Sequence, residues 1–258
     1  MASKIAKEIE EKVVVSYQEG RGTMELSKEF NIHRATVQKI LQRNNIKLRK
    51  RTPENKYNIH FFDNFSKESC YWAGFIAADG NIRSDRNSLN IHLAIEDLTH
   101  LQKFAKIINF TGNIEQSQKD CRINISGEWF IKALEKNFNI VPQKTKILEF
   151  PRQIPEEFLP DYIRGYFDGD GCISQTNGYL HISFTSGSKN FLNEIINYFF
   201  NKGILINNKN GKPKIYENSN AINYFCQNAF EILKILYENS YEEIRLTRKY
   251  NKYIERFV

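Results

Sequence analysis

The chain has 258 residues, enough for one large domain or two modest ones, and its 41% hydrophobic and 13% aromatic content is ample for a packed core. It contains no run of the ~20 apolar residues that a membrane span needs, and its first residues lack the apolar stretch of a secretory signal. The four cysteines have neither CxxC nor zinc-type spacing, so we expect free, buried thiols. A soluble protein of the cytoplasm (bacterial or phage) or of an organellar matrix is expected, with no membrane partner.

The positive charge is concentrated at the front of the chain. Residues 1–60 carry 13 Lys and Arg against 7 Asp and Glu, whereas the remainder carries 24 against 23. A basic N-terminal segment followed by a nearly neutral remainder favours a nucleic-acid-binding module at the N-terminus. The alternative is that the basic residues only form a solvated surface.

Residues 1–50 are expected to form short helices over 3–19, 23–30 and 34–43, the first closed by Gly20 and Gly22. The tight break between the last two predicts a helix-turn-helix, which resembles that of resolvases and transposases. An ordinary helical cap on the larger domain is the alternative. The predicted DNA contacts on the second helix and the following basic run are Arg34, Thr36, Gln38, Lys39, Arg49, Lys50 and Arg51.

A linker is expected over residues 51–65, and a long repeat follows it. Tyr71–Gly80 (YWAGFIAADG) matches Tyr162–Gly171 (YIRGYFDGDG), which places Asp79 and Asp170 91 residues apart. Each copy is followed by similar alternating and helical patterns. The strands expected are 81–85, 89–96, 112–116, 122–126, 172–176, 180–185, 204–208 and 214–217, and the further helices 97–109, 127–137, 188–201 and 219–238. The fold class predicted is α+β, with two pseudo-symmetric αββαββα halves over 66–150 and 151–258 behind a small all-α domain.

Small residues lie four apart in both motifs, on one face of each predicted helix, and would let the two helices pack very closely. These residues are Gly74, Ala78, Gly165 and Gly169. Gly80 and Gly171 are expected to end the helices by adopting the left-handed conformation.

Close packing of the helices would bring Asp79 and Asp170 together at the end of the helix pair. Two carboxylates at helix C-termini are electrostatically unfavourable, and divalent cations bridging them would resolve the conflict. Oxygen ligands suit Mg²⁺, with Mn²⁺ or Ca²⁺ able to substitute for binding. Two metal-binding acids beside a phosphodiester suit hydrolysis by a metal-activated water.

The paired motifs resemble those of single-chain LAGLIDADG homing endonucleases, over about residues 66–258. The resemblance implies that Asp79 and Asp170 are catalytic metal ligands, that the carbonyls of Ala78 and Gly169 assist, and that Lys144 and Lys249 are the basic catalytic residues. Neighbouring basic residues compete for that last role. The chain departs from the family pattern once, with Ala77 where the second motif has Asp168.

The resemblance also implies that each half's sheet lies in the DNA major groove. The outward polar residues predicted to contact DNA are Arg83, Asp85, Asn90, His92, Arg122, Asn124, Ser174, Thr176, His181, Ser183 and Lys214. A merely soluble sheet face is the alternative.

The function predicted is that of a monomer, with no required protein partner, that makes a double-strand break in a long, non-palindromic DNA target. By resemblance the cut leaves short 3′ overhangs. An RNA-splicing maturase and a non-cleaving DNA-binding regulator are the alternatives, although a regulator would be expected to lose the motif acids. A catalytic domain within an intein is disfavoured, because no cysteine or serine starts the chain and no His-Asn ends it.

Overall fold

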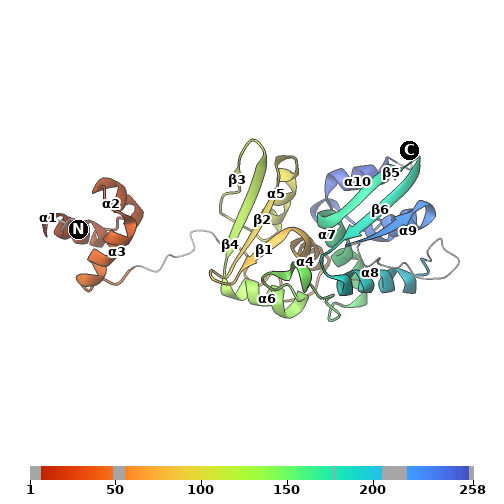
Figure 1. Ribbon diagram of the computed structural model, residues 1–258, viewed down its shortest axis with the longest axis horizontal. Coiled ribbons are helices and arrows are strands. Elements are labelled where there is room, and N and C mark those ends of the chain that lie inside the picture. Colours follow the sequence, from red (N-terminus) through yellow and green to blue (C-terminus); the bar gives the residue numbers. More distant parts are fainter. Residues whose placement is uncertain (1–6, 49–55, 177, 205–219, 256–258) are drawn as a thin grey trace. The chain divides into compact units, whose positions relative to one another are not determined.

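A computed structural model describes residues 7–48, 56–176, 178–204 and 220–255 (Figure 1). The chain divides into two compact units, Met1–Glu54 and Asn55–Val258.

The smaller unit contains three helices, α1 (Lys7–Gln18), α2 (Thr23–Glu29) and α3 (Arg34–Arg43), close to the predicted bounds. Asn31 adopts a positive φ of 49° between α2 and α3, and the His33 ring accepts a hydrogen bond from the Ala35 amide at the start of α3. The helices enclose their own small core of Val13, Tyr17, Leu26, Val37, Ile40 and Leu41.

The first half of the larger unit follows the predicted element order. Its elements are α4 (Lys67–Asp79), β1 (Gly80–Arg83), β2 (Ser88–Ala94), the 3₁₀ turn η1 (Ile95–Asp97), α5 (Leu98–Ile107), β3 (Glu115–Gln116), β4 (Asp120–Ser126) and α6 (Glu128–Phe138). The 3₁₀ turns η2 (Lys144–Lys146) and η3 (Glu156–Phe158) lie in the connection to the second half.

The second half repeats this order in the residues described. Its elements are α7 (Leu159–Asp170), β5 (Gly171–Thr176), β6 (Tyr179–Thr185), α8 (Lys189–Asn201), β7 (Ala221–Phe225), α9 (Cys226–Tyr237), η4 (Glu242–Ile244) and α10 (Thr247–Ile254). The α+β fold class is therefore confirmed.

Two antiparallel sheets form, with strand orders β1-β2-β4-β3 and β5-β6-β7 among the described residues (Figure 1). Strand alternation sets their two faces: Leu89, Ile91 and Leu93 of β2 are buried, while the residues between them point outward. The register places Asn90 opposite Asn124 on the outer face of the first sheet. In the second sheet His181 lies between Ser174 and Phe225.

The prediction of a helix over 219–238 is wrong for the first residues of that range. Residues 221–225 form β7 instead, with Ile222 and Tyr224 buried and Asn223 and Phe225 exposed. The helix begins only at Cys226, whose φ is +53°. A short alternating run that leads directly into an apolar helix is ambiguous by periodicity alone. The strands expected over 204–208 and 214–217 lie almost wholly outside the described residues.

Residues 56–65, part of the predicted linker, belong to the larger unit. Phe62 is fully buried and packs edge-on against Phe130 and Phe138 of α6. The side-chain amide of Asn137 donates a hydrogen bond to the Phe62 carbonyl at 2.8 Å. The segment therefore closes the end of the first half's core.

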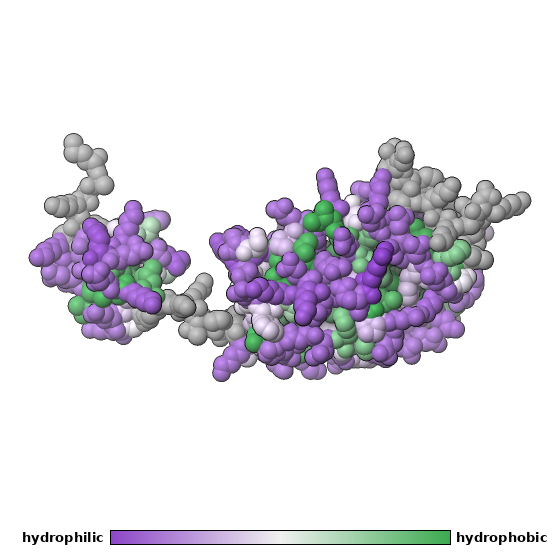
Figure 2. Space-filling model, turned by 90° about the horizontal axis from the view of Figure 1, so that it is seen from below, coloured by the Kyte–Doolittle hydropathy of each residue, from purple (hydrophilic) through white to green (hydrophobic). Residues whose placement is uncertain are grey.

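Hydrophilic side chains predominate on the face shown in Figure 2, as expected when apolar residues pack inside. All four cysteines are free, but Cys172 and Cys226 are exposed rather than buried. Within the described ranges, no helix has the length and apolar character needed to cross a membrane.

Candidate active site

Helices α4 and α7 lie side by side where the two halves meet, and two glycines allow their backbones to touch (Figure 1). A Cβ on Gly74 would lie 2.0 Å from the Tyr162 carbonyl oxygen, and one on Gly165 would lie 1.9 Å from the Tyr71 carbonyl oxygen. A Cβ on Gly169 would lie 2.3 Å from that of Ala78. The predicted close packing through small residues is confirmed.

Gly80 and Gly171 follow the two helices, but the reason predicted for them is wrong. Both are extended, with φ of −78° and −93°, and not left-handed. A Cβ on Gly80 would lie 2.6 Å from the Ile76 carbonyl oxygen, and one on Gly171 2.5 Å from that of Phe167. Glycine is required here because the chain turns tightly back over the last helical turn.

The helix pair brings the two motif aspartates to the same end. Asp79 is half-buried and Asp170 is exposed. A Cβ on Gly169, the residue before Asp170, would lie 3.0 Å from Asp79 Oδ2. The first motif's carboxylate thus lies against the end of the second motif.

The surroundings of the two carboxylates disfavour their charged forms. Burial, and next the neighbouring Asp170, together raise the pKa of Asp79 to about 6. Burial also raises the pKa of Asp170, which is opposed by Lys144, Lys249 and a hydrogen bond from the Tyr166 hydroxyl. The site therefore brings together two carboxyl groups whose ionisation the folded protein disfavours.

Lys144 and Lys249, the two predicted basic residues, lie at this end of the helix pair. Lys144 is 9% exposed and donates a hydrogen bond to the Gly80 carbonyl. Lys249 is 4% exposed and donates to the carbonyls of Phe167 (2.6 Å), Asp168 (2.8 Å) and Gly171 (2.6 Å). Each ammonium therefore lies against the C-terminal end of one motif helix, where the helix dipole favours a cation.

Burial lowers the pKa of Lys144 and lowers that of Lys249 to about 8, while the nearby aspartates act in the opposite direction. The sequence pointed to both lysines but not to their hydrogen-bond acceptors. These acceptors are main-chain carbonyl groups, which every residue has and which therefore carry no sequence signal.

The site could hold a hard cation through the carboxylates of Asp79 and Asp170, with the carbonyls of Ala78 and Gly169 on the last helical turns beside them. Within the described ranges, no cluster of three or more His, Cys, Asp or Glu residues could hold a metal. A cation at this site would therefore need ligands from the main chain, water or a bound substrate in addition to the two carboxylates.

The predicted polar residues of the first sheet lie on its outer face or at its edge, largely paired with one another. The Asn90 amide donates to Asn124 Oδ1 at 2.6 Å, and His92 lies 3.5 Å from Asp120. Two ion pairs complete this face, Arg122 with Glu115 (2.5 Å) and Arg83 with Asp85 (3.0 Å).

In the second sheet, His181 is held through both ring nitrogens, by Ser174 (3.0 Å) and Asn223 (2.9 Å), and it stacks on Phe225. Ser183 pairs in register with Asn223. Sequence reasoning missed Asn223 and Phe225, because it assigned β7 to a helix. The Thr176 side chain and Lys214 lie outside what the structure describes.

On α3, Arg34 and Lys39 are exposed, whereas Thr36 and Gln38 are half-buried. The predicted contacts Arg49, Lys50 and Arg51 lie outside the described residues.

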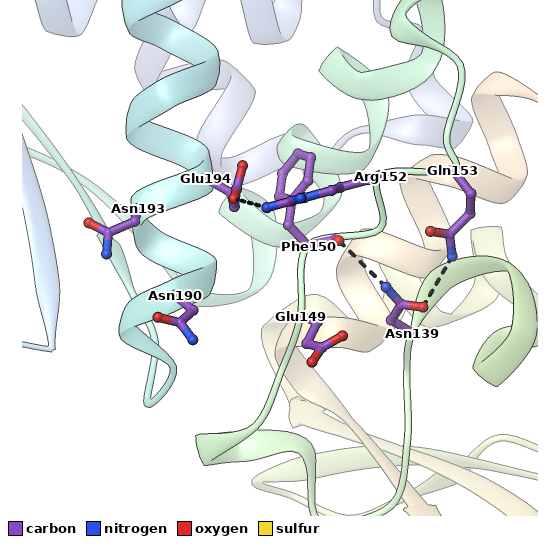
Figure 3. A pocket seen from close by; sticks show the side chains of 8 residues that line it. All are labelled: Asn139, Glu149, Phe150, Arg152, Gln153, Asn190, Asn193 and Glu194. Carbon is purple, nitrogen blue, oxygen red and sulfur yellow. Dashed lines mark hydrogen bonds and ion pairs between the residues drawn. The ribbon is translucent and has the colours of Figure 1, made fainter.

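A polar pocket of about 690 Å³ lies between the connection of the two halves and α8 (Figure 3). Four of its polar side chains form two internal pairs: Arg152 with Glu194 (2.6 Å), and the Gln153 amide with Asn139 Oδ1 (3.2 Å). It contains neither motif aspartate, so this pocket is separate from the candidate active site.

Among known families, a match is found for the second half. Residues 157–258 match the model of the LAGLIDADG-like domain. The first half has the same order of elements around the shared helix pair, so the larger unit has the α+β LAGLIDADG fold.

Two curated relatives are DNA polymerases. That of Thermococcus hydrothermalis is 24% identical over 120 residues, 44% of this chain and 7% of the polymerase. That of Thermococcus litoralis is 24% identical over 138 residues, 48% of this chain and 8% of the polymerase. The chain thus matches only a small part of either relative.

Similar solved structures include the LAGLIDADG homing endonuclease I-GzeII in complex with its DNA target, 16% identical with a TM-score of 0.44. That alignment covers 75% of this chain and 92% of I-GzeII. I-LtrWI bound to target DNA is 11% identical with a TM-score of 0.47, over 78% of this chain and 90% of that one.

Proposed function

We propose that this chain is a site-specific DNA endonuclease that hydrolyses one phosphodiester in each strand of a long, non-palindromic target. The observation that carries the proposal is the meeting of Asp79 and Asp170 at the end of one tightly packed helix pair, with a buried lysine beside each helix end. Fusion of two unlike halves in one chain supports a non-palindromic target and action as a monomer.

The residues present fit a divalent cation. Both carboxylates have raised pKa values, so the site carries an unfavourable concentration of negative charge that a cation would relieve. Asp79 and Asp170 would hold it, with help from the Ala78 and Gly169 carbonyls. Magnesium, when bound, would stabilise charge on the phosphate and activate a water for in-line attack.

The chain's own side chains supply the remaining chemistry. The lysines place positive charge beside the carboxylates, where they would offset charge that develops on the scissile phosphates. Their hydrogen bonds to helix-end carbonyls would hold that charge in position before DNA arrives. Retention of both aspartates favours cleavage over a purely regulatory role.

Recognition is assigned to the outer faces of the two sheets and to α3. Amide and imidazole groups such as Asn90, Asn124 and His181 suit base edges in the major groove. The exposed Arg34 and Lys39 suit phosphate contacts to one flank, as in a helix-turn-helix.

The test is cleavage by the purified full chain with Mg²⁺, first on a randomised duplex library to find a target and then on that target. Asp79→Asn and Asp170→Asn should abolish cutting and retain binding, because each removes a metal-binding charge without removing a DNA-facing group. Glu156→Gln, which removes an exposed carboxylate paired with Lys202, should cut normally. The proposal is rejected if either aspartate variant cuts at the rate of the unmodified protein.

A further inference from the structure

Two tyrosines occupy the same position in the repeated motif but have different surroundings. Tyr71 and Tyr162 are both fully buried in the packed helices. The Tyr71 hydroxyl donates a hydrogen bond to Asp168 Oδ2 at 2.8 Å, whereas the Tyr162 hydroxyl has no partner among the described residues. The repeat explains the difference, because the counterpart of Asp168 in the first motif is Ala77, which offers no acceptor.

Asp168 connects the second motif to the segment that carries Lys249. It is 1% exposed, and its carboxylate also accepts hydrogen bonds from the Tyr237 hydroxyl and from the Leu246 amide, the latter at 2.8 Å. Leu246 directly precedes α10, and its carbonyl accepts the Lys249 amide at 3.0 Å. One buried carboxylate therefore fixes the start of the helix that presents Lys249.

Residues of the first half also bind the segment that carries Lys249. Arg248 pairs with Asp97 through contacts of 2.8 and 3.0 Å. The Lys103 ammonium donates to the Arg245 carbonyl (3.2 Å) and to the Thr247 hydroxyl (2.8 Å). These bonds come from η1 and α5, so the Lys249 segment is anchored by both halves.

The Lys144 segment has different chemistry at the matching positions. In the alignment of the two halves, Gln143 corresponds to Arg248 and Ser188 to Asp97, so the ion pair has no counterpart there. Likewise, Ala77 corresponds to Asp168. Lys144 lies in the short turn η2 and donates to one carbonyl, whereas Lys249 lies in α10 and donates to four.

We propose, on the basis of the endonuclease function above, that Asp168 is the positioning residue for Lys249 and that the two DNA strands are cut in a fixed order. The strand whose cleavage depends on Lys249 is cut first, because that ammonium is already oriented and less ordering remains for the transition state.

The experiment is single-turnover cleavage of the selected target with a different fluorophore on each strand. Lys144→Met and Lys249→Met assign each strand to one lysine. In the unmodified protein the Lys249-dependent strand is expected to be cut faster, so a nicked duplex accumulates. Asp168→Asn should slow that strand by up to about a hundredfold, the cost of misplacing a catalytic group by about 1 Å, and leave the other strand unchanged.

The chain supplies a matched control pair. Tyr71→Phe removes a donor from Asp168 and should slow the same strand, whereas Tyr162→Phe removes an unpartnered hydroxyl and should change neither strand. Tyr237→Phe provides a second mild variant should Asp168→Asn not fold. The ratio of the two strand rates within one reaction separates positioning from a general loss of folded protein, which would slow both strands equally.

Three results would overturn this inference and leave the endonuclease function standing. The first is equal cutting rates of the two strands in the unmodified protein, and the second is lysine variants that slow both strands alike. The third is an unchanged ratio of strand rates in Asp168→Asn and Tyr71→Phe. Failure of the unmodified protein to cut any DNA would instead remove the endonuclease function, and the inference with it.

Discussion

Lys144 donates a hydrogen bond to the carbonyl of Gly80, the residue that follows Asp79. Lys249 does the same to Gly171, which follows Asp170, and also binds carbonyls of the last turn of α7. Each candidate catalytic lysine is therefore also part of the structure that ends a motif helix.

Lys249→Met should destabilise the larger unit more than Lys144→Met does. Loss of the ammonium leaves several buried carbonyls without their donor, at a cost of about 2–4 kcal/mol for Lys249 and about 1–2 kcal/mol for Lys144. Urea unfolding of both variants measures this difference. Lys146→Met, at an exposed neighbouring position, is the control and should be neutral. Equal destabilisation by the two buried substitutions would contradict the unequal bonding.

Gly74→Ala and Gly165→Ala should each prevent the close packing of α4 and α7. The added methyl would meet main-chain atoms about 2 Å away that cannot move without separating the helices. Overpacking of this kind should cost about 3 kcal/mol or more. Gly22→Ala, where a Cβ meets nothing within 4 Å, should leave the midpoint of urea unfolding nearly unchanged. A stable, fully active Gly74→Ala protein would show that the helices are not held at this distance.

Asp79→Asn should stabilise the cation-free protein at neutral pH. The pKa of Asp79 rises from 3.8 to about 6 on folding, so ionisation of this carboxyl opposes folding. The gain from the substitution should be about 1–2 kcal/mol above pH ~6, since Asp79 remains partly solvated, and should disappear below pH ~4, where the carboxyl is protonated in both states. Urea unfolding in a chelator at the two pH values measures it. A gain that persists in acid would show that charge is not its cause.

Divalent cations should raise the thermal unfolding temperature of the unmodified protein without DNA. A cation that binds only the folded state stabilises it by about 2.7 kcal/mol at a hundred times its dissociation constant. Differential scanning fluorimetry with Mg²⁺ or Ca²⁺ should show the rise, which chelation should reverse. The Asp79→Asn, Asp170→Asn double variant should show no rise, and an equal rise there would place the cation elsewhere.

Replacing Arg34 and Lys39 by alanine should weaken target binding without altering the single-turnover cutting rate. Each lost phosphate contact should reduce the slope of log affinity against log salt by about 1. Lys12→Ala on α1, which removes a cation paired with Glu8, is the matched control. Unchanged affinity and salt slope in the double variant would remove α3 from the proposed DNA interface.

Local patterns determined much of this protein. The repeat around Asp79 and Asp170, the small residues Gly74 and Gly165, and the alternation in β2 follow from periodicity and spacing, because helical and strand side chains recur at fixed intervals. These signals predicted the fold class and the two aspartates, and the family resemblance added both lysines.

Only the tertiary structure decided what those residues touch. Asp168 meets Leu246, 78 residues away, and Lys249 binds carbonyls 78 to 82 residues before it. It also decided that residues 221–225 form a strand, and that Gly80 and Gly171 are required by close approach and not by a left-handed conformation. Main-chain acceptors are present at every residue, so no local pattern indicates which of them the folded chain brings to a given side chain.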